Sequence, residues 1–135
     1  MTKFPAFIAA IAVASVTLAG SLSAQTALKD VARVRDGIIQ VGMAYEISEK
    51  CSSIRARTWR GIGFLQELKN YALSQGYSEA EVDAYVKDKE EERRLIAMAR
   101  AQLAALGVVE GDEASYCAVG RDQIARNTRV GWLLR

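Results

Sequence analysis

The sequence of 135 residues contains no histidine, the side chain that most often serves as a general base or a zinc ligand. Its two cysteines, Cys51 and Cys117, are too few and too far apart to form the four-ligand site of a structural zinc ion. The segment "GIGFLQ" carries Gln66 where a dinucleotide-binding loop needs its third glycine. We therefore expect a non-catalytic protein without a metal or a cofactor.

Proline is almost absent as well, because Pro5 is the only one and no proline interrupts a helix later in the chain. Segments rich in β-branched residues are equally scarce, since "VARV" and "GVV" are short and neither alternates over a useful length. Residues that favour helices dominate the remainder. The sequence therefore predicts an all-α fold of about four helices in one compact domain.

Long hydrophobic runs are confined to the amino terminus. Lys3 precedes "FIAAIAVASVTLAG", which ends in small residues and is typical of a secretory signal peptide. The run is too short to favour a membrane-spanning helix of about 20 strongly apolar residues, although an uncleaved anchor is the alternative. We predict a signal peptide over residues 1–24 and a single helical domain over 25–135, without a membrane span in the mature chain. Cleavage after Ser23 instead of Ala24 stays open.

The predicted export decides how the cysteines are interpreted. An even cysteine count in an oxidising compartment favours one disulfide, Cys51 to Cys117, in a periplasmic or secreted protein. The alternatives are a redox-labile bond or free thiols, because Arg55 and Arg121 each follow a cysteine by four residues and can lower a thiol pKa. Closing the intervening loop is expected to stabilise the fold by roughly 4 kcal/mol.

The charge balance argues against a nucleic-acid partner. Removal of the signal peptide takes away only Lys3, which leaves 17 basic and 16 acidic residues. A nucleic-acid binder is expected to be clearly basic. Only the segment from Arg121 onward has an excess of positive charge, with four arginines and one aspartate. We interpret it as a solvated helix end, with an acidic partner or anionic lipid as alternatives.

Apolar spacing and capping residues predict the first two helices. The first runs over residues 37–50, capped by Asp36. Ser52 and Ser53 cap or bend the start of the second, which runs from about Ile54 to Gln75 and is stopped by Gly76. Gly61 and Gly63 are interpreted as small residues that allow close helix packing. The inward residues are expected to be Ile38, Val41 and Tyr45 in the first helix, and Ile54, Gly61, Leu65, Leu68 and Ala72 in the second.

The strongest local signal is a capping box formed by Ser78 and Glu81, with Tyr77 and Val82 placed as a hydrophobic staple. The helix that begins there is predicted to extend over 79–106, to a stop at Gly107, with "KDKEEERR" as a solvated middle segment. Asp112 is predicted to cap a last helix over 113–127.

The carboxyl-terminal segment "RVGWLLR" carries large apolar residues close to the end of the sequence. Such residues need a burial site, either in this domain or in a partner. On the first interpretation, Gly131 turns the chain back and Trp132 fills a groove beside the disulfide. On the second, the segment docks on a protein partner, as the composition of interface hot spots suggests. The docking residues are then Arg129, Trp132, Leu133, Leu134 and Arg135.

The blocks "CSSIRAR", "GFLQELK", "GYSEAEVDAYV", "SYCAVGRDQIA" and "VGWLLR", in this order, resemble a family of small secreted alphaproteobacterial proteins classed as a domain of unknown function. The resemblance implies export and a helical fold, and it assigns no activity. Our leading hypothesis is a periplasmic interaction protein, such as an accessory subunit on the periplasmic face of an inner-membrane complex. The alternatives are a small disulfide-stapled helical chaperone or stress protein, and an enzyme or redox protein that uses the cysteines.

Overall fold

The computed structural model describes residues 24–135, so the predicted signal peptide lies outside the described residues except for its last one. The described chain forms one 3-10 helix and six α-helices, and the all-α prediction is confirmed. The helices are η1 (Leu28–Asp30), α1 (Ala32–Lys50), α2 (Thr58–Ser74), α3 (Glu79–Lys87), α4 (Lys89–Ala105), α5 (Glu113–Ala125) and α6 (Arg129–Trp132).

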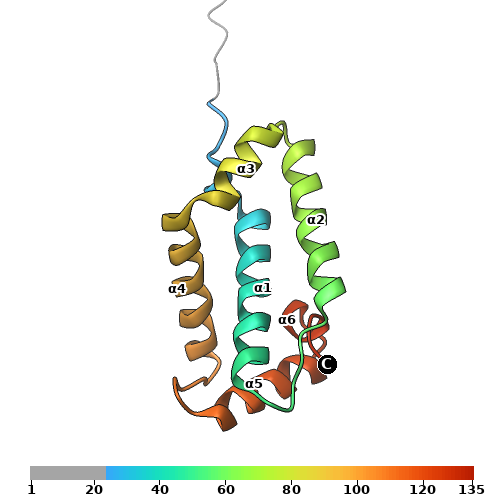
Figure 1. The fold of residues 1–135 in the computed structure, drawn as a ribbon, viewed down its shortest axis with the longest axis vertical. Helices are drawn as coiled ribbons and strands as arrows, with labels where there is room; N and C mark the ends of the chain where they lie inside the picture. Colours follow the sequence, from blue (N-terminus) through green and yellow to red (C-terminus); the bar gives the residue numbers. More distant parts are fainter. Residues whose placement is uncertain (1–23) are drawn as a thin grey trace, which may run out of the picture.

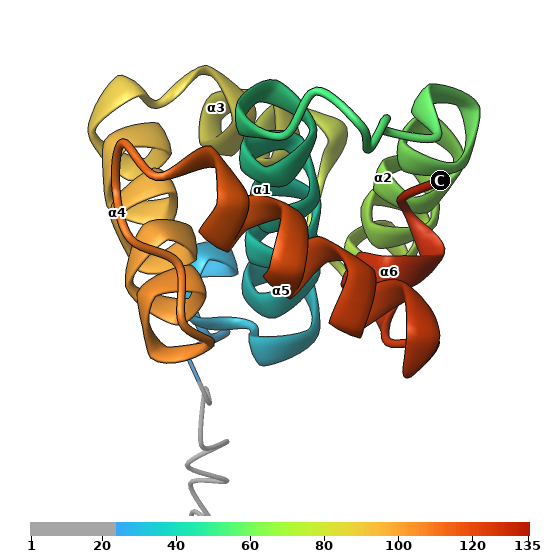
Figure 2. The same cartoon turned by 90° about the horizontal axis from the view of Figure 1, so that it is seen from below.

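Helix α1 is the centre of the arrangement. Helices α2 and α4 lie on either side of α1, and α3 spans the upper end of the molecule in Figure 1. Helix α5 crosses the opposite end and leads into the short α6, which lies near the start of α2 (Figure 2). Because α1 contacts α2, α4, α5 and α6, its apolar residues are buried on several sides.

The start of α1 differs from the prediction. The helix begins at Ala32, and Val31 precedes it without any side-chain cap. Asp36 is therefore not a cap but an exposed residue inside the helix, where its carboxylate lies 2.8 Å from Nε of Arg35. The buried side chains include Ile39 and Ile47, whereas Tyr45, expected to face inward, is exposed. The buried residues of α1 therefore do not form the single apolar stripe that spacing predicts, because other helices cover α1 on more than one side.

Helix α2 also begins later than predicted. Ile54 is buried, but it lies in the connection that leads from Cys51 to the start of the helix at Thr58. The buried side of α2 consists of Phe64, Leu68 and Ala72, which are spaced by four residues. Leu65, expected to face inward, is exposed.

The single helix predicted over 79–106 is wrong, because the chain breaks at Asp88 into α3 and α4. The predicted capping box at the start of α3 is confirmed: Oγ of Ser78 accepts from the backbone N–H of Glu81 at 3.1 Å, and the Glu81 carboxylate accepts from the N–H of Ser78 at 2.7 Å. Asp88 is a second cap, and its carboxylate accepts from the backbone N–H groups of Glu90 and Glu91. Aspartate is a preferred cap, and the glutamates that follow it complement the positive helix end.

The interpretation of Gly61 and Gly63 as packing residues is also wrong, because a Cβ atom at either position would meet nothing within 4 Å. The close approach is made at Gly37, where a Cβ atom would lie 2.7 Å from Cδ1 of Leu68. Gly120 does the same for α5, because a Cβ atom there would lie 2.6 Å from Cδ1 of Ile54. These two glycines let α2 and α5 approach their neighbours closely.

The open space at Gly63 yields a first prediction. Gly63→Ala should raise the free energy of unfolding by about 1 kcal/mol, because alanine favours the helical backbone and meets no neighbour here. Urea unfolding followed by circular dichroism measures the change. Gly37→Ala is the matched control and should destabilise the protein, since Leu68 must move. If Gly63→Ala destabilised the protein as well, α2 would not be a regular helix at this point.

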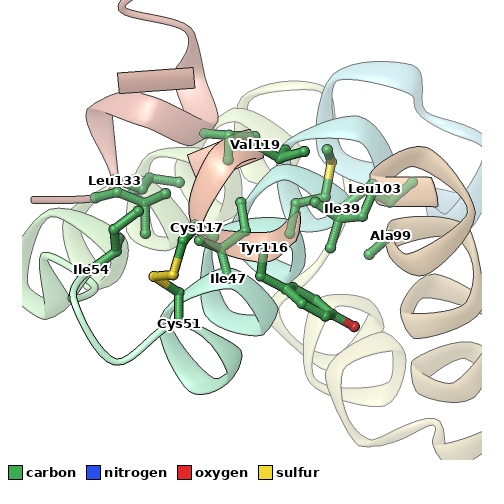
Figure 3. Close-up of a cluster of buried hydrophobic side chains, with 14 of the residues drawn as sticks. Ile39, Ile47, Cys51, Ile54, Ala99, Leu103, Tyr116, Cys117, Val119 and Leu133 are labelled. Atoms are coloured by element: carbon green, nitrogen blue, oxygen red, sulfur yellow. A yellow bond between two sulfur atoms is a disulfide. The ribbon is translucent and has the colours of Figure 1, made fainter. Parts of the chain in front are cut away.

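The main core surrounds the disulfide and joins α1, α4, α5 and the tail of the chain. Figure 3 shows Ile47 of α1, Leu103 of α4 and Leu133 of the tail in the same cluster. The Cys51–Cys117 bond is confirmed, and its Cα atoms lie 5.2 Å apart. A second, smaller cluster lies near α3 and consists of Leu28, Val34, Ala72, Tyr77 and Val82.

Candidate functional site

A groove of about 680 Å³ runs between the first four α-helices. Its floor contains buried apolar side chains from each helix: Val34 of α1, Leu68 of α2, Val82 of α3 and Leu95 of α4. Helices α2 and α4 form its sides, since they flank α1 (Figure 1). We call this feature the apolar groove.

Large apolar side chains gather at the rim of the apolar groove. Within residues 24–135, nine large apolar side chains are exposed, and five of them line this groove with exposed fractions of 38–69%. They are Tyr45, Ile62, Leu65, Val86 and Ile96. Single exposed apolar residues are normal on a protein surface, but a contiguous group around a depression is typical of a binding site.

The sequence carried a signal for this site that the analysis of spacing missed. Helix α2 has one apolar stripe that is buried, at Phe64 and Leu68, and a second stripe that stays exposed and lines the groove, at Ile62 and Leu65. An amphipathic helix that packs on one side needs only one such stripe. The second stripe therefore indicates a surface that is available to another molecule.

The charged residues along the groove are mainly acidic. Asp83, Asp88 and Glu92 line it, whereas Lys69 is the only basic lining residue within the described chain. Nζ of Lys69 lies 2.7 Å from the carboxylate of Glu79, so its charge is already matched. The groove thus combines an apolar floor and rim with negative charge at the end formed by α3 and α4.

An ion pair within the first turns of α4 lies beside the joint between α3 and α4. The guanidinium of Arg94 donates two hydrogen bonds to the buried carboxylate of Glu91, at 2.6 and 2.8 Å, and holds the pKa of that carboxyl below its ordinary value. The hydroxyl of Tyr85, a groove residue, lies 3.4 Å from the same carboxylate, and burial raises the pKa of Tyr85 to about 12. The carboxylate of Glu91 thus contacts both Arg94 of α4 and Tyr85 of α3.

This geometry predicts a pH-dependent contribution to stability. Because the pKa of Glu91 is lowered by folding, the pair stabilises the protein above the ordinary glutamate value of 4.5, and the contribution is lost as the pH falls through the lowered value. Glu91→Gln should therefore lower the free energy of unfolding by about 1–2 kcal/mol at pH 7, and by less in strong acid. Urea unfolding across the pH range measures both effects.

The control is Glu90→Gln, since Glu90 is exposed and forms no ion pair within residues 24–135. It should change stability little at any pH. A loss at neutral pH of the same size in both variants would contradict the assigned role of Glu91.

The predicted docking segment lies mostly inside the domain. Leu133 and Leu134 are buried in the main core, and Gly131 lies within α6. Trp132 is partly buried, and its ring meets that of Phe64 edge to face, with the centroids 6.4 Å apart. Arg129 and Arg135 are exposed. The segment thus contributes to the core, and a docking role for its exposed residues stays a prediction.

Two kinds of group are absent from residues 24–135, a free thiol and a cluster of metal-binding side chains. Both cysteines are engaged in the buried disulfide, and the structure leaves no free thiol in residues 24–135. Over the same range, no three cysteine, aspartate or glutamate side chains lie close enough together to hold a metal ion. None of the helices that the structure describes has the length and apolar character needed to cross a membrane.

The comparison with known protein families gives a match over most of the chain. The model of DUF5333, a family of unknown function, matches residues 26–135. The match spans nearly all of the described chain, and the protein belongs to this family. No curated protein and no solved structure shows significant similarity to the chain.

Proposed function

We propose that this member of the DUF5333 family is a non-catalytic interaction protein that binds an apolar helical segment of another protein in the apolar groove. The observation that carries the proposal is the group of five exposed apolar side chains around the groove. Removing such side chains from water is the main driving force for protein association. A groove between helices with an apolar floor accommodates an amphipathic helix through residues spaced by three and four.

Charge complementarity indicates what kind of helix fits. Asp83 and Glu92 line the groove on the α3 and α4 side. Within the described chain the carboxylate of Asp83 forms no ion pair, whereas that of Glu92 lies 2.7 Å from Nζ of Lys89. A partner helix with lysine or arginine beside its apolar stripe would match these charges, and an acidic helix would be repelled. The proposed occupant is therefore an apolar helix with basic flanking residues.

The proposed setting is the periplasm, where the partner would belong to an inner-membrane complex and this protein would be an accessory subunit. The buried disulfide supports an oxidising compartment, because such bonds persist in exported proteins. The amino-terminal sequence favours export for the separate reason given above. The role of accessory subunit rests on the apolar groove, which is left open to solvent in the isolated chain.

A pair of peptides tests the proposal. Both carry the same apolar residues at helical spacing, and they are flanked by lysines in one peptide and by glutamates in the other. Calorimetry should show that the protein binds the lysine peptide about tenfold more tightly, since two exposed charge pairs contribute up to about 1 kcal/mol each. The double variant Asp83→Lys, Glu92→Lys should reverse this preference. Equal affinities in both proteins would contradict the proposed charge complementarity.

Variants at the rim distinguish binding in the groove from nonspecific hydrophobic binding elsewhere on the surface. Ile62→Asp places a charge in the groove and should abolish binding of both peptides. Val109→Asp is the matched control, because Val109 is equally exposed but lies outside the groove lining. Binding of any unfolded chain regardless of flanking charge would instead favour the chaperone alternative. Self-association, or uptake of a fatty acid in place of the peptides, would identify a different occupant and contradict the proposal.

A further inference from the structure

Two segments from distant parts of the chain contain no acidic residue and lie side by side. Residues 51–66 and 123–135 include no aspartate or glutamate. They are joined by backbone hydrogen bonds from Arg55 N–H to the Arg135 carbonyl at 2.8 Å, and from Arg135 N–H to the Arg55 carbonyl at 2.9 Å. The N–H of Arg57 also donates to the carbonyl of Leu133 at 2.7 Å. The fold therefore combines two basic segments into one surface.

We call this surface the basic end, and its two segments carry six arginines. Arg57 is half-buried and donates from Nε to the carbonyl of Leu134 at 2.8 Å. The other five are exposed: Arg55, Arg60, Arg126, Arg129 and Arg135. Only Arg126 pairs with a carboxylate in the described chain, that of Asp122 at 3.2 Å. The rest of residues 25–135 carries eleven basic and sixteen acidic side chains. The total charge is thus close to zero although the two basic segments are positive and the rest of residues 25–135 is negative.

The densest group of acidic residues lies at the opposite end of the molecule. One other carboxylate, that of Glu113 in α5, lies beside the basic end, where it accepts from the backbone N–H and the hydroxyl of Ser52 at 2.9 and 2.6 Å. Residues 79–92, which form α3 and the start of α4, include seven acidic and two basic side chains. In Figure 1, α3 and the start of α4 lie at the upper end, whereas α6 and the start of α2 lie at the lower end. An anionic surface would attract one end and repel the other, so the charge separation also orients the molecule.

An exposed tryptophan lies within the basic end. Trp59 has an exposed fraction of 84%, the highest of the large apolar side chains in residues 24–135. It is in the first turn of α2, between Arg57 and Arg60. Close by, the guanidinium groups of Arg60 and Arg129 lie over the ring of Trp132, at 5.1 and 5.0 Å from its centroid. This stacking holds both guanidinium groups beside the ring, and Nη1 of Arg60 also donates to the carbonyl of Trp132 at 3.1 Å.

We propose that the basic end docks the protein on a membrane surface of anionic phospholipid. Arginines supply the attraction to lipid phosphates, and tryptophan is the side chain that prefers the interface between head groups and acyl chains. A flat surface meets only the basic end, whereas a polyanion that wrapped around the protein would also meet the acidic end. This docking does not depend on occupation of the apolar groove.

Vesicle binding tests the inference on the purified protein. At low salt, the protein should co-sediment with vesicles made of equal parts phosphatidylglycerol and phosphatidylcholine. It should not co-sediment with vesicles of pure phosphatidylcholine. Trp59→Ser should weaken binding without changing its dependence on salt. Arg55→Gln with Arg60→Gln should weaken it about 25-fold, or about fivefold for each arginine, and should reduce the salt dependence.

The matched control is Lys87→Gln with Arg93→Gln, which removes the same charge from exposed positions outside the basic end. It should bind anionic vesicles at least as well as the unchanged protein. Because Trp59 is exposed, Trp59→Ser keeps the test valid even if the arginine variant fails to fold. Absence of binding to anionic vesicles, or an equal loss in the control, would overturn the inference. Tighter binding to poly-glutamate or duplex DNA than to vesicles would overturn it too.

Discussion

Loss of the Cys51–Cys117 bond should lower the free energy of unfolding by about 4 kcal/mol, because the bond closes a loop between residues 66 positions apart. It joins the end of α1 to the opening turns of α5, and both sulfur-bearing residues are buried in the main core. Domains of this size are typically stable by about 5–15 kcal/mol, so the loss is a large fraction of the total. Guanidinium unfolding of the double variant Cys51→Ala, Cys117→Ala measures it.

Reduction of the unchanged protein is the control for this prediction. Dithiothreitol breaks the same bond without removing a sulfur atom, so both experiments should lower the unfolding midpoint by similar amounts. A larger loss in the double variant alone would measure the cavities left by the alanine side chains. An unchanged midpoint after complete reduction would show that the bond does not hold α1 and α5 together.

Gly131→Ala should be comparably damaging, with an expected loss of at least about 3 kcal/mol. A Cβ atom at this position would lie 1.9 Å from the backbone carbonyl oxygen of Gln123, and a backbone atom cannot move aside as the end of a side chain can. Helix α6 would have to separate from α5, and Val130, Leu133 and Leu134 would leave the core. Thermal unfolding followed by circular dichroism measures the loss.

Gly63→Ala is the control here as well, since it makes the same substitution in a helix with open space around it. It should raise the unfolding temperature while Gly131→Ala lowers it. If Gly131→Ala retained full stability, α6 would be able to leave α5 at little cost. The carboxyl-terminal segment would then be free to dock on a partner, as the second sequence-based interpretation holds.

The features that sequence predicted correctly are those fixed by chemistry between near neighbours. The capping box at Ser78 and the cap at Asp112 each depend on residues within three positions. Gly76 and Gly107 end their helices with φ angles of 95° and 111°, which favour glycine. The disulfide was predictable for a different reason, because two cysteines in an oxidising compartment have one partner each.

The features that sequence did not predict depend on contacts between distant residues. No residue before α1 caps it, and its start follows η1, whose Leu28 is buried in the smaller cluster near α3. The sequence predicts that the charged run containing Asp88 is the solvated middle of one long helix, whereas the carboxylate of Asp88 caps a new helix. Local sequence rules permit either a continuous helix or a new helix capped by Asp88. In the structure the helix breaks there, and α4 packs against α1.

The apolar groove illustrates the same limit. Spacing correctly places Leu68 and Ala72 on an inward face, but it cannot say that one side of α1 between α2 and α4 is left uncovered. Tyr45 and Leu65 were assigned to the core because an apolar residue on a helix is usually buried. Both line the groove instead, and they are the residues from which the proposed function follows.

Photocrosslinking in intact cells tests the central claim, occupation of the apolar groove by a partner helix, most directly. A photoreactive amino acid replaces Ile62 at the rim, and a second protein carries it at Val109, which is exposed outside the groove. We expect position 62 to crosslink one apolar helical segment of another protein, with lysine or arginine beside it, and position 109 to give no such product. Crosslinks from position 62 only to lipid or to a second copy of this chain would contradict the account.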